Sequence, residues 1–448
     1  MMKPTYDTID FYMLIILKPF KYIFHIFSFA LLSLLLTACT FTPSPPPIVE
    51  LPQQGITSQN IGLLIKHNDQ LSLQTAQLYQ QARAIPDEHI FYVDLPDNAN
   101  MPPKQFKILY QKLMSQAGND IQAFVATWQA PYRVGCMSIT SALAFGYDKK
   151  WCQPKKKGCF PTPNSPYFNS NSNAPWKELN MRPTMLLTGK DYKSINALIQ
   201  RGVQSDGTRP KGHAYLIKTK DKARSTRAGL FKRFATHFPS HSLLKIHFLD
   251  ASTPSMTDYI SLKENVMFYQ TGLKHVPDIH TNRYLPGAIA DHLTSTGGQG
   301  LSEQGQMKAF RWLEAGATGS YGTVVEPCNF VQKFPNPEIL IPRYLQGETL
   351  IEAYWKSVLQ PSEGLFIGEP LAKPYNLFNV FRSGDKLTII TNQLNPNKPY
   401  QLLEWQKKKQ RFIPISAQFS VTSFNNTITI HAQKANSSKY KVVELRTE

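Results

Sequence analysis

The sequence lacks three features that would each indicate a familiar class of protein. No two cysteines stand at C-x₂-C spacing, which argues against a structural zinc site. No internal repeat is evident, so a repeat architecture is not expected. The apolar run at residues 22–36 is shorter than the ~20 residues that a membrane-spanning helix needs.

The N-terminus instead has the pattern of a secretory signal. Lys18 and Lys21 precede the apolar run, which ends in the letters LTAC at Cys39. This ending resembles the bacterial lipobox, in which the cysteine is diacylated, palmitate being a usual acyl chain, and becomes the new N-terminus. By the same resemblance, Thr40 rather than Asp after the cysteine favours the outer membrane, on its periplasmic or its surface face.

Four parts of the chain are expected from these patterns and from the change in composition near residue 375. A proline-rich spacer, PSPPP, follows the lipobox and lifts the folded part off the bilayer. The expected parts are a signal peptide at 1–38, a lipidated tether at 39–56, an α/β domain at 57–375 with an insertion at 131–173, and a β-sandwich at 376–448.

Acidic residues are also fewer than basic ones. The expected export of the protein determines which partners this positive charge favours. Asp and Glu number 31 against 49 Lys and Arg, for a formal charge of +18. Residues 1–38 hold three lysines and two aspartates, so the mature chain keeps +17. At the envelope, the expected partners are the membrane, through the lipid anchor, and an anionic polymer or a secreted protein. Nucleic acid is not expected, because the basic runs are scattered and not interleaved with stacking aromatics.

The other cysteines predict disulfides in an oxidising compartment. Cys136, Cys152, Cys159 and Cys328 make an even number. Cys152 and Cys159 could close a small loop, which would leave Cys136 for Cys328. Four cysteines permit three pairings, and the sequence does not choose among them.

Alternating apolar and amphipathic segments predict an α/β fold with a mostly parallel sheet flanked by helices. Strands are expected at 61–65, 89–95, 121–128, 184–187, 214–217, 243–249, 266–269, 286–293, 316–325 and 365–367. Helices are expected at 72–82, 104–116, 191–201, 222–236, 304–314 and 345–359. The insertion is expected to run over the surface, and short β runs after residue 376 predict the small sandwich.

Polar side chains gather at the ends of two expected strands within residues 285–330. Asp291 and His292 end one strand, a Thr-Ser-Thr-Gly-Gly turn with Ser295 follows it, and Glu326 and Cys328 follow the next strand. Chemistry in open parallel sheets gathers at the carboxyl ends of strands. The stretch therefore predicts a site at this edge.

Several segments resemble an uncharacterised family of secreted or lipid-anchored proteins from bacteria that carry the exosortase sorting system. The matching text, across most of residues 85–370, includes IPDEHIFYVDLP, RPTMLLTGKDY, RGVQSDGTRPKGHAYLIKTKDKAR and GATGSYGTVVEPCNFVQKFPNP. That family has no established activity, so the resemblance implies a secreted or lipid-anchored location but no reaction.

RPTMLLTGKDY, GATGSYG, GETLIEAYWKSV and GEPL are also similar to segments of the gingipain-type cysteine peptidases. This distant resemblance implies a caspase-like fold followed by an immunoglobulin-like module. Two departures stand against the peptidase mechanism. The family's histidine falls near residues 269–272, where there is none, and its nucleophile falls near residues 293–295, where there is no cysteine.

Three kinds of site remain open at the predicted edge. Cys328 could act as nucleophile with His292 as base and Asp291 or Glu326 as orienter, unless Cys328 is half of a disulfide. Ser295 could replace the cysteine, with backbone N–H groups of the following glycines facing an oxyanion. A metal held by Asp291, His292 and Glu326, with His275 or His280, lacks helical ligand spacing, so no metal and no cofactor is expected.

Two functions follow as expectations. The first is a lipid-anchored envelope protein with a peptidase-like hydrolase domain that acts on or binds an envelope polypeptide or polysaccharide. The second is a non-catalytic scaffold or accessory lipoprotein of a polysaccharide-export or protein-sorting system, in which the same residues are structural.

Overall fold

A computed structural model describes residues 47–52, 55–153, 159–302, 304–394, 398–421 and 427–445. The expected signal peptide and the lipobox cysteine, Cys39, lie outside the described residues. Within the described part of the chain, none of the helices combines the length and the hydropathy needed to cross a bilayer.

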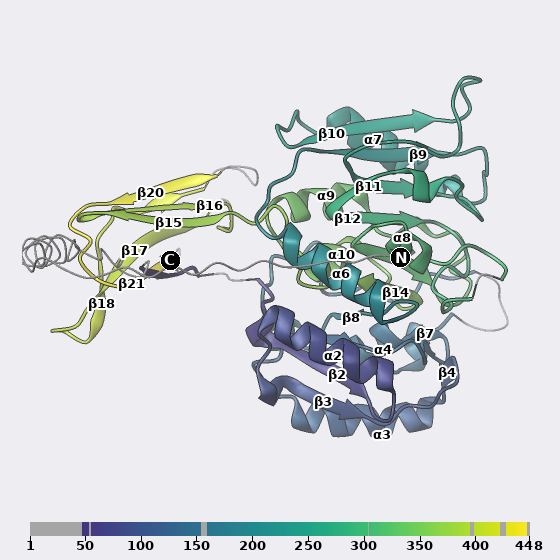
Figure 1. Cartoon of the computed structure of the whole chain (residues 1–448), viewed down its shortest axis with the longest axis horizontal. Coiled ribbons are helices and arrows are strands. Elements are labelled where there is room, and N and C mark those ends of the chain that lie inside the picture. The colour runs from purple at the N-terminus through teal and green to yellow at the C-terminus, as the bar shows by residue number, and fades with distance from the viewer. Residues whose placement is uncertain are drawn as a thin grey trace, which may run out of the picture. The chain divides into compact units, whose positions relative to one another are not determined.

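The main sheet has ten strands and consists of two parallel halves (Figure 1). The halves meet at β13 and β14, which pair antiparallel, whereas every other neighbouring pair runs parallel. In spatial order the strands are β10 (Leu244–Asp250), β9 (Gly212–Lys218), β11 (Val266–Thr271), β12 (Tyr284–His292), β13 (Gly319–Thr323), β14 (Gly364–Gly368), β8 (Thr184–Leu186), β5 (Ala123–Ala126), β2 (Ile61–Lys66) and β3 (Ile90–Val93). The predicted mostly parallel sheet is confirmed.

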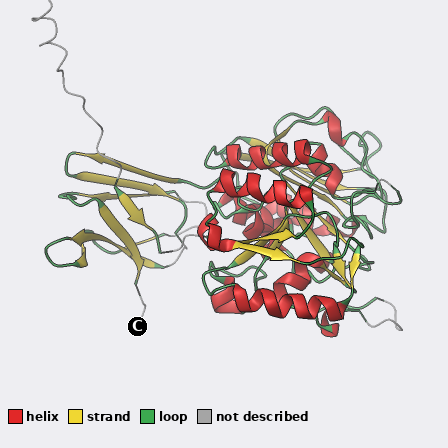
Figure 2. Ribbon diagram, turned by 60° about the horizontal axis from the view of Figure 1, so that its bottom comes forward, coloured by secondary structure: helices red, strands yellow, loops and turns green. Residues whose placement is uncertain are grey.

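Helices cover this sheet, as Figure 2 shows in red. They are α2 (Gln70–Arg83), α3 (Pro103–Gln116), α4 (Ile139–Phe145), α5 (Pro175–Leu179), α6 (Tyr192–Ser205), α7 (Ala228–His237), α8 (Phe310–Glu314), α9 (Pro337–Leu345) and α10 (Leu350–Ser357). α2 packs against α6 and β2, and α7 packs against β9, β10 and α9. Short 3₁₀ turns are η1 (Ser58–Asn60), η2 (Asp87–His89), η3 (Lys149–Trp151), η4 (Ser225–Arg227), η5 (Ile279–Thr281) and η6 (Val331–Lys333).

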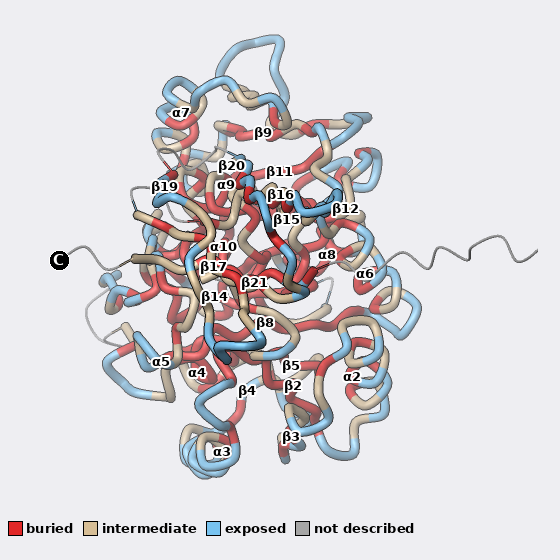
Figure 3. The backbone as a smooth tube through the Cα atoms, turned by 90° about the vertical axis from the view of Figure 1, so that its left-hand side faces the viewer, coloured by how far each residue is buried: buried red, intermediate tan, exposed pale blue. Residues whose placement is uncertain are grey.

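The central strands are buried on both faces, which is why they read as continuous apolar runs (Figure 3). All six residues of β2 and the last six of β12 are buried. A side chain at a strand end in this sheet is therefore covered unless the following loop opens above it.

The insertion at 131–173 is more than the surface excursion that its composition predicted. Residues 139–144 of α4 are all buried, and α4 packs against β8 and β14. A small sheet of β4 (Asn100–Met101), β6 (Arg133–Val134) and β7 (Met137–Ser138) leads into it. The apolar letters ITSALA form a core helix because Ser138 caps its first turn through the Ser141 N–H.

The predicted C-terminal sandwich is confirmed, and it includes a strand from the other end of the described chain. One sheet holds β1 (Ile48–Glu50), β21 (Lys439–Glu444), β17 (Pro399–Gln406), β18 (Arg411–Pro414) and β19 (Phe419–Ser420). The other holds β15 (Phe378–Ser383), β16 (Lys386–Thr391) and β20 (Ile428–Ala432). Apolar residues of both sheets form one core, to which β1 adds Val49. Part of the expected tether at 39–56 is thus a strand, paired in parallel with β21.

Candidate functional site

The predicted site residues follow β12 and β13, two neighbouring parallel strands. β11 lies on the other side of β12, and Thr271 is level with His292. The segments after these strands, together with residues 219–227 after β9, meet at one edge of the sheet, where Thr226 Oγ1 donates to the Asn329 carbonyl at 3.3 Å. The sequence therefore predicted the edge of the sheet at which these segments meet. The contacts of their side chains determine which chemistry is possible there.

His292 is fully enclosed and both of its ring nitrogens are engaged. The Trp312 indole N–H donates to Nδ1 at 2.9 Å, and Nε2 lies 3.1 Å from the Met307 carbonyl. An indole N–H can only donate, so Nδ1 must be the acceptor and Nε2 carries the proton. Burial lowers the pKa of His292 to about 3. The imidazole is therefore a neutral structural group with no lone pair left to accept a proton.

Asp291 points to the opposite face of the sheet, because consecutive strand residues alternate between faces. Its carboxylate lies 2.6 Å from Nη1 of Arg227 and accepts a hydrogen bond of 2.8 Å from Gln270 Nε2. Arg227 is 1% exposed and also donates to the Thr271 carbonyl at 2.8 Å. Burial raises the pKa of Asp291, and the Arg227 guanidinium opposes that shift. Asp291 therefore neutralises a buried arginine and does not orient His292.

Ser295 lies half-buried in the turn after β12, among polar side chains that hold the turn together. Gln306 Oε1 accepts from Thr294 Oγ1 at 2.7 Å and from the Thr296 N–H at 2.9 Å. Arg224 Nε donates to Thr294 Oγ1 at 3.2 Å. No hydrogen bond of the Ser295 hydroxyl is found within the described ranges. The structure does not bring His292 to it as a base.

The two glycines after Ser295 serve packing. A Cβ on Gly298 would lie 2.5 Å from the Gly322 carbonyl oxygen, so only glycine fits where the turn crosses β13. The Gly298 N–H donates to the Thr323 carbonyl at 2.9 Å. That N–H is therefore unavailable to an oxyanion, in contrast to the expectation from the sequence.

Cys328 forms a disulfide with Cys159, and Cys136 forms one with Cys152. The observed pairing differs from the one considered from the sequence, in which Cys152 would pair with Cys159 and Cys136 with Cys328. A disulfide sulfur is no nucleophile for general-base activation, so the oxidised protein has no thiol mechanism at Cys328. Glu326 is exposed, and its carboxylate accepts the Cys328 backbone N–H at 2.8 Å. It caps its own turn and does not reach toward His292.

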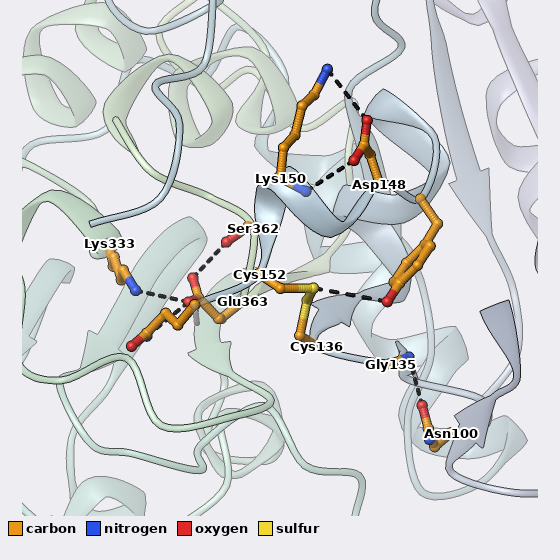
Figure 4. Close-up of a disulfide and its surroundings, with 11 residues drawn as sticks. Asn100, Gly135, Cys136, Asp148, Lys150, Cys152, Lys333, Ser362 and Glu363 are labelled. Carbon is orange, nitrogen blue, oxygen red and sulfur yellow. Dashed lines mark hydrogen bonds and ion pairs between the residues drawn. A yellow bond between two sulfur atoms is a disulfide. The ribbon is translucent and has the colours of Figure 1, made fainter. Parts of the chain in front are cut away.

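The Cys136–Cys152 disulfide lies near a buried ion pair that joins the segments after β13 and before β14 (Figure 4). Lys333 Nζ contacts Glu363 Oε1 at 2.7 Å, and both side chains are covered. Ser362 and Gln153 also donate to the Glu363 carboxylate, and Gln153 donates to the Glu326 carbonyl at 3.1 Å. Burial lowers the pKa of Lys333, and Glu363 raises it again. These contacts hold the segment around Cys328 in place.

The residues considered for a metal are not assembled into one site. Asp291 and His292 point to opposite faces, Glu326 caps a turn, and His280 Nε2 lies 3.2 Å from Arg311 Nη2. Within the ranges that the structure describes, no three His, Cys, Asp or Glu side chains are placed to hold a metal ion together.

The sequence did not predict the two side chains that engage Asp291 and His292, which are Arg227 and Trp312. Arg227 lies in a basic run at residues 218–233, and Trp312 lies in the helix expected at 304–314; neither position predicts a contact with Asp291 or His292. A signal for Arg227 existed, because its neighbours Leu230, Phe231 and Phe234 place it on the apolar side of a helix.

Comparison with known proteins adds little to this geometry. No protein-family model and no curated protein matches the chain. A solved chain described as "Structure of Protease" superposes with a TM-score of 0.41 at 9% sequence identity, covering 87% of this chain and 98% of that chain. At that distance the likeness says nothing about catalysis in this chain.

Proposed function

We propose that the protein is a lipid-anchored component of the bacterial cell envelope that binds an envelope polymer or a secreted polypeptide without hydrolysing it. Its α/β domain supplies the binding scaffold, and the polar residues after β12 and β13 hold that scaffold together. This favours the scaffold or accessory role over the hydrolase role that the sequence left open.

The observation that carries the proposal is the hydrogen bonding of His292. A general base must be within hydrogen-bond reach of the proton that it removes, and it needs a free lone pair. The Trp312 N–H occupies the acceptor nitrogen, and the ring is 1% exposed. Asp291 is committed to Arg227, and Cys328 is committed to Cys159. Neither nucleophile suggested by the sequence has a base beside it.

The envelope address is supported by the N-terminal signal pattern and by the cysteines. Disulfides persist in oxidising compartments and are rare in a reducing cytosol. Both pairs, Cys136–Cys152 and Cys159–Cys328, agree with export. The net charge of +18 favours anionic headgroups or acidic polymers as counterparts.

The test of the non-catalytic role is activity-based labelling of the full-length protein. A serine-directed fluorophosphonate and a thiol-directed alkylating probe are applied to wild type and to Ser295→Ala, with denatured and reduced protein as the control for thiol access. We expect no fluorophosphonate label on either form, and alkylation only after reduction. Label on wild type that Ser295→Ala abolishes would establish a serine hydrolase and overturn the proposal.

The address is tested separately by metabolic labelling with radioactive palmitate and by membrane fractionation. Wild type should incorporate label and sediment with outer membranes, whereas Cys39→Ser should do neither. Cys136→Ser serves as the matched cysteine control. Equal labelling of wild type and Cys39→Ser would rule out the lipid anchor.

A further inference from the structure

A groove of about 460 Å³ runs between β3, the last strand of the main sheet, and the helix that follows it, α3 (Figure 1). It belongs to the other half of the sheet from the strand ends considered above. One wall consists of residues 92–96, from the end of β3 and the loop after it. The other wall is a stripe of α3 residues spaced mostly three or four apart: Gln105, Ile108, Leu109, Lys112, Leu113 and Gln116.

β3 is an edge strand whose outer backbone groups face away from the sheet. Among the described strands its neighbour is β2 alone, and Val93 is level with Lys66 in that parallel pair. The His67 N–H donates to the Val93 carbonyl at 2.9 Å, so the backbone of Val93 faces β2. Consecutive strand residues direct their backbone groups to opposite edges, so the N–H and C=O of Tyr92 point outward. An unpaired edge of this kind is a template for one more strand.

α3 offers an apolar surface beside this edge. It buries Phe106 and Leu113, whereas Ile108 on the stripe that faces the groove is 70% exposed. Tyr92, on the opposite wall, is 54% exposed. A strand added about 4.8 Å from β3 would direct every second side chain toward α3. The stripe thus lies where the side chains of an additional strand would pack.

The charges beside the groove favour an acidic partner. α3 carries Lys104, Lys107 and Lys112 and no acidic residue, and none of these three has an ion pair within the described ranges. Lys112 lines the groove itself. The lining also holds Asp94, whose carboxylate lies 3.2 Å from His67 Nδ1. Acidic side chains among apolar ones would complement the α3 wall.

The same features disfavour two other occupants. A second copy of this chain, paired edge to edge through β3, would bring the lysines of two α3 helices together on one face of the joined sheet. An acidic polysaccharide would meet the lysines but has no regular row of amide groups to pair with the β3 edge. A polypeptide supplies that row, with a donor and an acceptor on each residue.

We propose that this groove binds an extended peptide segment of a secreted protein, which adds to β3 as an eleventh strand of the main sheet. Main-chain hydrogen bonds to the Tyr92 edge supply affinity, and alternate side chains supply specificity. Apolar side chains of the peptide pack on Ile108, and an acidic one pairs with Lys112. The proposal rests on the binding role proposed above, and it names a polypeptide rather than a polymer as the partner.

The test is fluorescence anisotropy with the full-length protein in detergent and three labelled peptides of about ten residues. The first alternates Val and Glu, the second alternates Val and Lys, and the third is the first with its backbone amides N-methylated. We expect the Val-Glu peptide to bind with a Kd below about 100 µM. The other two should bind at least about tenfold more weakly, because one carries the wrong charge and the other cannot donate to the edge.

Three variants separate the contacts. Tyr92→Pro removes the outward N–H of β3 without taking a bond from its pairing with β2, and it should abolish binding. Ile108→Ser should weaken the Val-Glu peptide about tenfold or more. Lys112→Glu should exchange the preference, so that the Val-Lys peptide binds better than the Val-Glu peptide. Phe381→Ser, which changes an exposed aromatic of the sandwich, is the matched control and should bind like wild type.

Ile108→Ser and Lys112→Glu guard against misfolding of Tyr92→Pro, because both change exposed side chains of α3. Three results would overturn the proposal: no binding of the Val-Glu peptide at about 1 mM, with or without binding of polygalacturonate; equal binding by wild type, Ile108→Ser and Lys112→Glu; or a dimer that Tyr92→Pro dissociates. Failure here with no fluorophosphonate labelling would remove the peptide groove alone. Ser295-dependent labelling would remove the non-catalytic role and leave the groove standing.

Discussion

At the scale of single residues, Asp291 and His292 show how two adjacent polar side chains can have unrelated tasks. The alternation of a strand sends one to Arg227 and the other to Trp312, across the thickness of the sheet. Both are buried, Asp291 in an ion pair with Arg227 and His292 in a hydrogen bond from Trp312. Their contribution is therefore to stability, and it can be measured without knowing any ligand.

The first prediction concerns the acid sensitivity that His292 confers. Its pKa is about 3 in the folded protein and about 6.5 when unfolded, so between these values the unfolded state binds the extra proton. Stability from this group is complete above pH 6.5 and is lost as pH falls, by about 1.4 kcal/mol per pH unit. Urea unfolding at pH 6.5 and pH 4 should show wild type losing about 3 kcal/mol more than His292→Gln. Equal losses would mean that the imidazole is protonated in the fold.

The second prediction concerns the buried ion pair. Asp291→Asn leaves the Arg227 guanidinium buried without a counter-charge, which should lower the free energy of unfolding by about 3–5 kcal/mol. The double variant Arg227→Met with Asp291→Leu should recover most of that loss, since no unpaired charge remains. Chemical denaturation of the three proteins measures both effects. A single variant as stable as wild type would show that water reaches the pair.

The same residues show which features of the candidate site could be predicted from the sequence and which could not. The types and positions of Asp291, His292, Ser295 and Cys328 were readable, because polar groups after apolar runs mark strand ends. Their partners were not, because Arg227 and Trp312 are distant in sequence and their contacts depend on the packing of α7 and α8.

At the scale of elements, the turn between β12 and α8 is fixed by contact with β13. Gly297 and Gly298 lie against Gly322, where a Cβ on Gly322 would come within 2.5 Å of the Gly297 carbonyl carbon. The backbone of Ala309 donates to the Gly297 carbonyl at 2.7 Å. The helix expected at 304–314 begins only at Phe310, because residues 304–306 bend and Ala309 is bonded back to the turn.

The third prediction follows from that close approach. Gly298→Ala should lower the free energy of unfolding by about 2–3 kcal/mol, because the obstructing atom is a backbone oxygen that cannot rotate away. Gly229→Ala, inside α7 and with open space around its Cβ position, is the matched control and should be neutral or stabilising by about 0.5–1 kcal/mol. Thermal unfolding of both variants checks the contrast.

Most strands were predictable because their apolar runs are short, continuous and separated by helical periodicity. The reversal of β14 was not, since an antiparallel partner leaves the same apolar pattern as a parallel one. α4 was missed because its helical letters stand within a segment rich in Pro, Asn and Ser. α9 was missed because Pro342 interrupts its pattern.

At the scale of the whole molecule, the two disulfides close loops of very different length. Cys159 and Cys328 are separated by 169 positions, and Cys136 and Cys152 by 16. The chain-entropy argument gives about 5 kcal/mol for the longer loop and about 3 kcal/mol for the shorter one. The sequence could supply the even count but not the pairing, which depends on how the insertion returns to the segment after β13.

The fourth prediction compares the two bridges. The double variant Cys159→Ala with Cys328→Ala should unfold at lower urea than Cys136→Ala with Cys152→Ala, by about 2 kcal/mol in free energy. The comparison is made under oxidising conditions, with reduced wild type as the reference for loss of both bridges. The opposite order would show that the shorter bridge supports structure which the longer one does not.

The pairing of β1 with β21 determines how the molecule would bear a load. Ile48, Val49 and Glu50 align with Lys439, Tyr440 and Lys441, so the earliest described strand is held by the last. With the amino-terminal lipid anchor that we propose, a pulling force on the protein would reach this pairing first. The force would shear the short parallel pairing of β1 with β21 in the sandwich. The α/β sheet would bear no load until that pairing separated.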